Sequence, residues 1–149
     1  MGFFNGNGTK EEQILRICQD YCQLNAITMK DYFPLPFMDS ILNAVAGHEC
    51  YSFLDGFSGY NQVQIAKEDQ LKTTFTTDWG TSAYRDMSFG LCNAPATFQR
   101  IMTNAFQKYL RIPMEIFLDD FYVFSCNEDH LEWLDKYLIQ CAKFGISLN

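Results

Sequence analysis

Several features that would narrow the function of a protein are scarce or absent in this sequence. Its six cysteines form no Cys-x-x-Cys pair and its two histidines, His48 and His130, stand far apart, which excludes a zinc finger. No apolar run approaches the roughly 20 residues of a membrane span, and the N-terminus lacks the basic start and long apolar core of a signal peptide. The sequence therefore predicts an intracellular protein without a membrane segment, in which the cysteines are reduced.

Positive charge is also in short supply. The chain has 11 lysines and arginines against 18 aspartates and glutamates, which gives a net charge of −7. Because neutralisation of phosphates supplies much of the affinity for nucleic acids, this balance excludes a wholly basic binding surface but leaves room for a local basic strip. Magnesium bound at an acidic cluster would offset part of the negative charge.

What the sequence does contain is enough apolar material for one folded domain. Its 149 residues are 48% hydrophobic and 16% aromatic, a composition that argues against disorder. There is no internal repeat. We expect a flexible leader over residues 1–13 and a folded domain over residues 14–149.

Hydrophobic periodicity predicts strands and helices that alternate without the regular rhythm of a parallel doubly wound sheet, so we expect the α+β class. The expected elements are a strand over 14–21, a connecting arm over 24–36, a helix after Pro36 that ends at Gly47, a strand over 50–55, a hairpin of 72–77 with 82–89, a helix over 94–110 capped by Asn93, a strand–turn–strand over 116–125, and a helix capped by Asn127 that ends at Gly145.

The most informative stretch is the strand–turn–strand, because two adjacent aspartates, Asp119 and Asp120, fall at its turn. One interpretation is a solvated acidic turn. The other is a cation site, since neighbouring carboxylates repel unless a positive charge lies between them. A third acid, Asp55, ends another apolar strand and is followed by a glycine, which lets a ligand approach the backbone closely. If those strands are neighbours, the three carboxylates form a set of the kind that holds two metal ions.

Four segments in this order resemble successive motifs of a reverse transcriptase, in particular those of plant elements of the Gypsy class of long-terminal-repeat retrotransposons. They are LNAITMKDYFPLP (24–36), CYSFLDGFSGYNQ (50–62), YRDMSFGLCNAPATFQRIM (84–102) and IFLDDF (116–121). The resemblance implies an antiparallel palm sheet backed by helices with partial fingers, and it implies RNA-directed DNA polymerase activity. The thumb, primer grip, connection and ribonuclease H regions are expected to be absent.

Site residues follow from the same resemblance. It implies that Asp55, Asp119 and Asp120 hold two Mg²⁺ ions, with Mn²⁺ as an alternative, and that the Gly56 carbonyl lies near the metal and triphosphate. Addition of a deoxynucleotide to the primer 3′ end would then proceed by two-metal phosphoryl transfer.

The resemblance also implies contacts with the nucleotide and the nucleic acid. Phe117 would pack near the primer end, and Tyr60 would exclude a ribose 2′-hydroxyl by a steric clash. Arg16 would stack on the incoming base, while Phe89 and Gly90 would form the floor of the nucleotide pocket.

On the helix that follows, Gln99 and Arg100 would lie toward the template, although Arg100 fits a plain surface role equally well. The expected partners are an RNA or DNA template, a primer and deoxynucleoside triphosphates, with the rest of a Pol polyprotein or a second subunit as further partners. The expected location is a cytoplasmic particle, the nucleus or both.

Three positions depart from the family pattern. Cys22 stands where an arginine is usual, Asp86 replaces a second basic residue, and Ser88 replaces a proline. Because two of these changes remove positive charge near the expected template path, two alternatives stay open. One is a catalytically inactive retroelement fragment. The other is a nucleic-acid or protein interaction module on the same scaffold, which would bind without magnesium.

Overall fold

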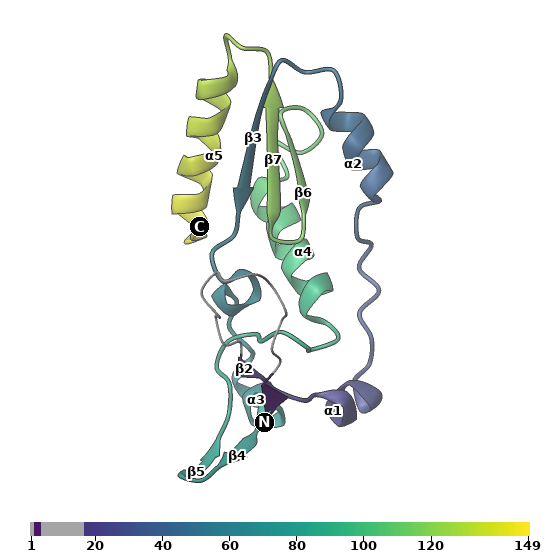
Figure 1. Cartoon of the computed structure of the whole chain (residues 1–149), viewed down its shortest axis with the longest axis vertical. Helices are drawn as coiled ribbons and strands as arrows, with labels where there is room; N and C mark the ends of the chain where they lie inside the picture. Colours follow the sequence, from purple (N-terminus) through teal and green to yellow (C-terminus); the bar gives the residue numbers. More distant parts are fainter. Residues whose placement is uncertain (1, 4–16) are drawn as a thin grey trace.

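A three-stranded antiparallel sheet organises residues 2–3 and 17–149, the part of the chain that this computed structural model describes (Figure 1). Its strands are β3 (Cys50–Asp55), β6 (Met114–Phe117) and β7 (Asp120–Ser125), in the order β3-β7-β6. The central strand β7 is the most buried of the three because it has a neighbour on both edges. The predicted α+β class with an antiparallel sheet is confirmed.

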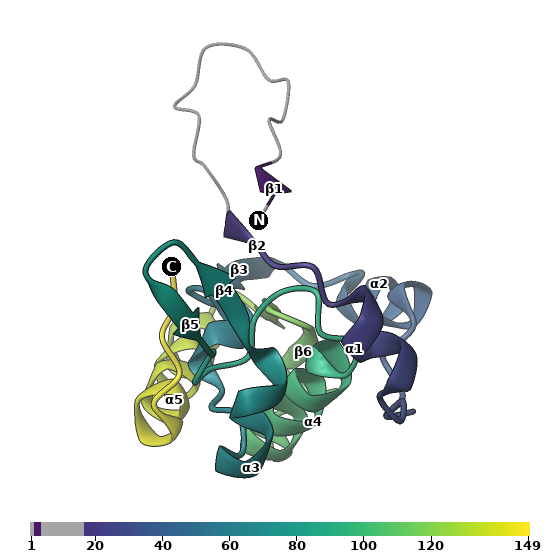
Figure 2. The same cartoon turned by 90° about the horizontal axis from the view of Figure 1, so that it is seen from below.

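Helices α4 (Ala94–Phe106) and α5 (His130–Phe144) cover one face of this sheet, and α2 (Met38–Val45) lies beside the edge strand β6 (Figures 1 and 2). The opposite face of β3 remains open, so the aromatic side chains of Tyr51 and Phe53 are exposed. Within the described residues, no helix combines the length and the apolar character needed to cross a membrane.

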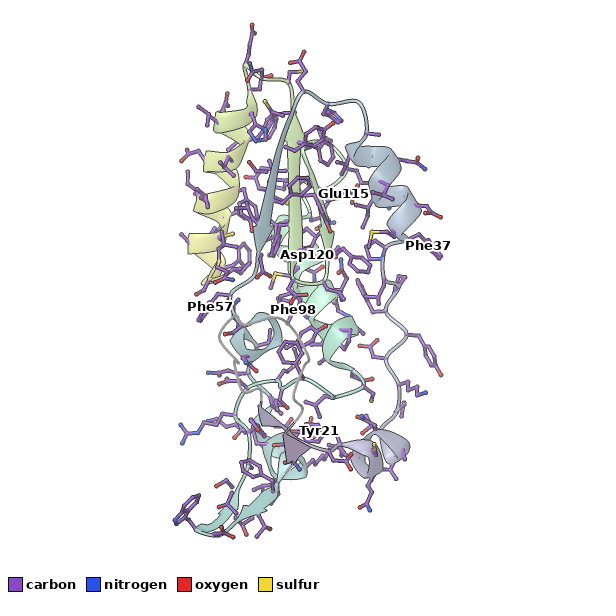
Figure 3. All side chains as sticks on the ribbon, in the orientation of Figure 1. Tyr21, Phe37, Phe57, Phe98, Glu115 and Asp120 are labelled. Carbon is purple, nitrogen blue, oxygen red and sulfur yellow. The ribbon has the colours of Figure 1, made fainter. Side chains whose placement is uncertain are left out.

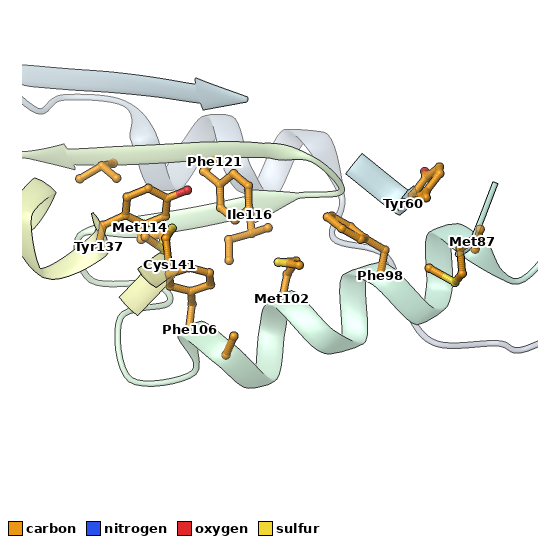
Figure 4. Packing of buried hydrophobic residues seen from close by; sticks show 13 residues of the cluster. Tyr60, Met87, Phe98, Met102, Phe106, Met114, Ile116, Phe121, Tyr137 and Cys141 are labelled. Atoms are coloured by element: carbon orange, nitrogen blue, oxygen red, sulfur yellow. The ribbon is translucent and has the colours of Figure 1, made fainter. Parts of the chain in front are cut away.

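The hydrophobic core lies between the sheet and the two covering helices (Figure 4). Phe98, Met102 and Phe106 are spaced four residues apart on α4 and therefore share one helical face. Phe106 packs against Phe121 of β7 and stacks on Tyr137 of α5, with ring centroids 5.7 and 5.2 Å apart. This aromatic contact fixes both helices against the strand that starts at Asp120.

Shorter elements form the part of the molecule beyond the end of the sheet, at the bottom of Figure 1. They are β1 (Gly2–Phe3), β2 (Ile17–Cys18), α1 (Cys22–Ile27), the 3-10 helix η1 (Gly59–Gln62), α3 (Lys67–Gln70), the 3-10 helix η2 (Leu71–Thr73), β4 (Phe75–Thr77) and β5 (Gly80–Ser82). Of the predicted leader, only Gly2–Phe3 are described, and these residues pair with Ile17–Cys18.

The predicted connecting arm over residues 24–36 is wrong in its first part, because residues 24–27 complete helix α1. The Asp20 carboxylate accepts a hydrogen bond from the Cys22 backbone N–H at 2.8 Å, which satisfies one free donor at the helix start. At the other end, the Thr28 hydroxyl donates to the Leu24 carbonyl at 2.7 Å. The arm is extended only after Thr28.

Several predicted boundaries also need correction. The strand expected over 14–21 is described only as Ile17–Cys18. The expected hairpin pairs Phe75–Thr77 with Gly80–Ser82, so its second strand lies before most of the predicted range 82–89. The helix from Ala94 ends at Phe106 rather than residue 110. Helix α5 starts after Asp129 rather than Asn127, and the Asn127 side-chain oxygen accepts a hydrogen bond from the Cys50 thiol at 3.3 Å instead of capping the helix.

Candidate metal and nucleotide site

The antiparallel register brings the three predicted acids to one end of the sheet. Asp55, the last residue of β3, lies directly opposite Asp120, the first residue of β7. Asp119 precedes Asp120, and its carbonyl accepts a hydrogen bond from the Gly56 backbone N–H at 2.9 Å. The two acid-bearing strands are therefore neighbours, which meets the condition that the sequence left open.

A two-residue turn presents the acid pair. Phe117 pairs with Asp120, so the turn consists of Leu118 and Asp119 alone. The predicted strand–turn–strand is therefore present, but Asp120, which was expected at the turn, is the first residue of β7. Leu118 has a φ of +56°, a conformation that is uncommon for a residue with a branched side chain. Non-glycine residues in this region are held there by their surroundings, and they cluster at functional sites.

The carboxylates of the acids contact different neighbours. The Asp119 carboxylate lies against Gly59, where an added Cβ would come within 3.0 Å of its Oδ2. The Asp55 Oδ2 accepts a hydrogen bond from the Asn149 side-chain amide at 3.3 Å. Over residues 2–3 and 17–149, no three histidine, cysteine or acidic side chains already converge as a metal-binding group. Convergence of the three carboxylates on one ion therefore requires side-chain rotation.

The negative charges of the other two acids affect the pKa of Asp120. Asp120 is exposed at the surface of the sheet, yet partial desolvation raises the pKa of its carboxyl, and the charges of Asp119 and Asp55 raise it further. A bound cation would relieve this repulsion, and hard divalent cations prefer carboxylate oxygens. The three carboxylates therefore have the donor chemistry that magnesium prefers. Figure 3 shows Asp120 at the end of the sheet, on the side where Phe98 in the first half of α4 lies.

Tyr60, the predicted sugar contact, lies close to the acids. It is buried between Phe89 and Phe98, with ring centroids 5.0 and 5.5 Å from its own. Burial raises the pKa of its hydroxyl, and the nearby charge of Asp119 adds to the shift. The structure therefore brings Tyr60, Phe89 and Asp119 together, while their contacts with a nucleotide stay predictions.

The loop that contains Phe89 and Gly90 is held by α1. Gly90 has a φ of +96°, and a Cβ at this position would press against Tyr21 at 3.4 Å, so both the backbone and the packing favour glycine. The Asn25 side chain donates to the Gly90 carbonyl at 2.7 Å and accepts from the Cys92 backbone N–H at 2.9 Å. This role of Asn25 was not predicted from the sequence.

Apart from Gln99, the remaining predicted site residues are Arg16, Phe117 and Arg100. Arg16 lies outside the described residues. Phe117 ends β6 beside the acid pair, where its contact with a primer stays a prediction. Arg100 forms an ion pair with Asp31 and lies over the Phe33 ring at 5.2 Å, so in this structure it fastens the connecting arm to α4. These contacts are compatible with the plain surface role of Arg100, and its contact with the template stays a prediction.

Gln99 has a position that the sequence analysis did not anticipate. Only 2% of the residue is exposed, and its side chain binds the backbone of the acid-bearing hairpin rather than solvent. Its contact with the template stays a prediction. A signal for burial was present, because Gln99 precedes Met102 by three residues and Phe106 by seven, so it shares the apolar face of α4 with them.

The end of the chain also contributes to the site. Backbone hydrogen bonds join Phe57 to Ser147 and Asn149 to Asp55, and the Gln62 side chain bonds to the Phe57 carbonyl and to Ser147. Residues 147–149 therefore lie antiparallel beside residues 55–57, where Leu148 forms an isolated bridge with Gly56.

Comparison with known proteins identifies the fold and its relatives. The model of the family described as reverse transcriptase (RNA-dependent DNA polymerase) matches residues 9–149. An RNA-directed DNA polymerase homolog from Oenothera berteroana is 39% identical over 127 residues, which are 85% of this chain and 89% of that protein. The retrovirus-related Pol polyprotein from transposon 297 of Drosophila melanogaster is 36% identical over 89% of this chain.

Solved structures agree with this assignment at the level of the fold. The foamy viral protease-reverse transcriptase in complex with RNA/DNA hybrid superposes with a TM-score of 0.81 at 19% identity, over 99% of this chain and 19% of that one. The chain spans only 13% of the transposon 297 polyprotein and 21% of the enzymatic polyprotein of cauliflower mosaic virus. The match nevertheless extends across nearly all of the present chain, which therefore belongs to the reverse transcriptase family of RNA-directed DNA polymerases.

Proposed function

We propose that this chain is the catalytic fingers and palm portion of a reverse transcriptase from a plant Gypsy-class retrotransposon. Its reaction is the RNA-templated addition of deoxynucleotides to a primer 3′ end. The observation that carries the proposal is the register that sets Asp55 opposite Asp120, with Asp119 in the adjoining turn. Three acids on rigid neighbouring strands are the arrangement that two-metal phosphoryl transfer requires.

Asp55, Asp119 and Asp120 would hold two Mg²⁺ ions, or Mn²⁺ in their place, with the Gly56 carbonyl close to them. When bound, the ions would favour ionisation of the primer 3′-hydroxyl and offset the charge of the pyrophosphate leaving group. The chain itself supplies the anchoring. Antiparallel pairing fixes the backbones of Asp55 and Asp120. The hydrogen bond from the Gly56 N–H to the Asp119 carbonyl fixes the turn that joins β6 to β7.

The nucleotide would bind next to the acids. Tyr60 lies beside Asp119 and against Phe89, where a bulky ring would clash with a ribose 2′-hydroxyl and so select deoxynucleotides. Phe89, which is largely exposed, and Gly90 would form the pocket floor, with Arg16 on the incoming base and triphosphate. Phe117 would contact the primer end.

Partners and location complete the proposal. Solved relatives are complexes of a foamy viral reverse transcriptase with RNA/DNA hybrid and with double-stranded DNA, and we assign the same classes of nucleic acid to this chain. Because the related polyproteins are much longer, the rest of a Pol polyprotein or a second subunit would complete the grip on the duplex. Synthesis would take place in a cytoplasmic particle, with delivery of the DNA to the nucleus.

Primer extension on an RNA template with Mg²⁺ tests the proposal. The Asp119→Asn, Asp120→Asn double variant should lose extension by at least about a hundredfold, because it removes two of the three predicted metal ligands. The matched control is the Asp39→Asn, Asp135→Asn double variant, which removes the same charge from exposed positions on α2 and α5. It should extend the primer as the wild type does.

Circular dichroism must show all three proteins folded. If the folded wild type does not extend a primer, the enzymatic proposal fails for this chain. Magnesium-independent binding of nucleic acid that survives in the Asp119→Asn, Asp120→Asn variant would then favour an interaction module. An absence of both activities would favour an inactive fragment.

A further inference from the structure

The side chain of Gln99 makes two hydrogen bonds to the strand and turn that carry the acid pair. Its Nε2 donates to the Ile116 carbonyl at 3.1 Å, and its Oε1 accepts from the Leu118 backbone N–H at 2.7 Å. The backbone partners determine the orientation of the amide, because a carbonyl accepts only and an N–H donates only. Both polar side-chain atoms of the buried Gln99 therefore have a hydrogen-bond partner.

The Ile116 carbonyl lies on the outer edge of the sheet, and the Leu118 N–H follows in the adjoining turn. Among the described residues, β6 pairs with β7 on one side and with no further strand on the other, where Leu110 forms an isolated bridge with Met114. A carboxamide carries the same donor and acceptor as a peptide group, so Gln99 replaces the missing neighbouring strand at this point. The rest of the edge is approached by α2 and α4.

The second of these hydrogen bonds ends on the most unusual backbone position of the hairpin. Leu118 has a φ of +56° and is followed directly by Asp119 and Asp120. A non-glycine residue persists in this conformation only when its surroundings hold it there. Loss of this hydrogen bond would leave the partly buried Leu118 N–H without an acceptor. It would also remove the contact that holds Leu118 in its positive-φ conformation.

We infer that Gln99 is a positioning residue, which holds the Leu118 turn so that Asp119 and Asp120 face Asp55. It touches none of the acids and acts only through the backbone. The structural part of this inference stands on the two hydrogen bonds, while its consequence for cation binding rests on the function proposed above.

Amide hydrogen exchange, followed by NMR on the purified chain, tests the structural part. The Gln99→Met variant keeps the length and packing of the side chain but removes both hydrogen bonds, so exchange at the Leu118 amide should be at least about tenfold faster. Exchange at Phe121 and Val123 in the central strand should be unchanged. In the wild type, the Leu118 amide should be protected from exchange, because its N–H is bonded to the Gln99 Oε1.

Gln140→Met is the matched control. Gln140 also donates from its side chain to a backbone carbonyl, that of Ala105 near the other end of α4, at 2.5 Å. This variant should leave Leu118 exchange unchanged. Unchanged exchange at Leu118 in folded Gln99→Met would overturn the inference. If Gln99→Met does not fold, an unprotected Leu118 amide in the wild type overturns it instead.

A titration with Mg²⁺ alone, read from the amide signals of Asp119 and Asp120, tests the consequence for the site. The half-saturating Mg²⁺ concentration should rise by about three- to tenfold in Gln99→Met and stay constant in Gln140→Met. Faster exchange at Leu118 with unaltered Mg²⁺ binding would refute a positioning role. If the wild type itself does not bind Mg²⁺, the proposed metal site fails, while the exchange data still decide on the hydrogen bonds.

Discussion

At the scale of single residues, the three aspartates make the end of the sheet electrostatically unfavourable. Asp120 lies directly across from Asp55 and next to Asp119, and no lysine or arginine among the described residues forms a salt bridge with any of them. Their repulsion helps to raise the pKa of Asp120. A site that stabilised the fold alone would not gather like charges in this way, which is why their placement indicates a ligand.

This repulsion predicts a pH-dependent effect of Asp120→Asn. Because the pKa of Asp120 in the folded state is raised above its ordinary value of 3.8, the folded state binds the proton more tightly than the unfolded state. The free energy of unfolding therefore falls as the pH rises from the ordinary pKa of 3.8 to the raised pKa of the folded state. Above the raised pKa, the loss is complete. Asp120→Asn should raise the midpoint of thermal unfolding at pH 7 by about 1–3 °C and have little effect near pH 3.

The control is Asp135→Asn on the exposed face of α5, which should show no such difference between the two pH values. Addition of Mg²⁺ at pH 7 should raise the midpoint of the wild type more than that of Asp120→Asn. A midpoint for Asp120→Asn that equals the wild-type value at pH 7 without Mg²⁺ would argue against repulsion at this site.

At the scale of elements, α1 and the arm that follows it secure the loop of Phe89 and Gly90, which we propose as the floor of the nucleotide pocket. Asn25 binds both sides of this loop, at Gly90 and Cys92. From the loop, Asn93 donates to the Met29 carbonyl at 2.9 Å and accepts from the Asp31 backbone N–H at 3.0 Å. Asn93 precedes α4 as predicted, but its side chain bonds to the arm and makes no capping hydrogen bond to the helix.

Asn25→Ala should therefore weaken both the fold and the pocket. Loss of two side-chain hydrogen bonds should lower the free energy of unfolding by about 1–2 kcal/mol, as measured by urea denaturation. The KM for deoxynucleotides should rise more than kcat falls, because the loop at Phe89 and Gly90 loses its support. Asn43→Ala, at an exposed position of α2 with no side-chain hydrogen bond, should change neither quantity. Equal effects of the two variants would contradict the role of Asn25.

At the scale of the whole molecule, the core joins the sheet to both covering helices through Tyr137. Only 1% of this residue is exposed, and its ring packs against Phe106 and Phe121. Its hydroxyl has no hydrogen-bond partner among the described residues, and burial strongly raises its pKa. Tyr21 is also buried, but its hydroxyl lies 2.8 Å from the Ser88 hydroxyl and shares a hydrogen bond with it.

The two tyrosines should respond oppositely to removal of the hydroxyl. Tyr137→Phe should raise the free energy of unfolding by about 1 kcal/mol, because it removes an unsatisfied buried polar group. Tyr21→Phe should lower it by about 1 kcal/mol, because it leaves Ser88 without its partner. Denaturant unfolding of the two variants measures both changes, and a loss of stability in Tyr137→Phe would show that its hydroxyl has a partner after all.

Several features of the molecule could be predicted from the sequence, because they depend on contacts between residues that are close along the chain. The strand that ends at Asp55 and the helix that starts at Ala94 were read from local periodicity and turn residues. The tight turn between the strands on either side of Asp119 was predicted in the same way, although Asp120 belongs to the strand rather than to the turn. The motifs around these elements also indicated the reverse transcriptase family, which the comparisons confirm.

Only the tertiary structure decided how these pieces meet. The register of β3 with β7 sets Asp55 against Asp120, and pairing between distant strands leaves no trace in the local pattern of either one. The same holds for Gln99, which the motif placed at the template but which folding buries against Leu118. A side chain's neighbours on its own helix are fixed by helical spacing, whereas its partners across the core depend on the packing of the whole chain.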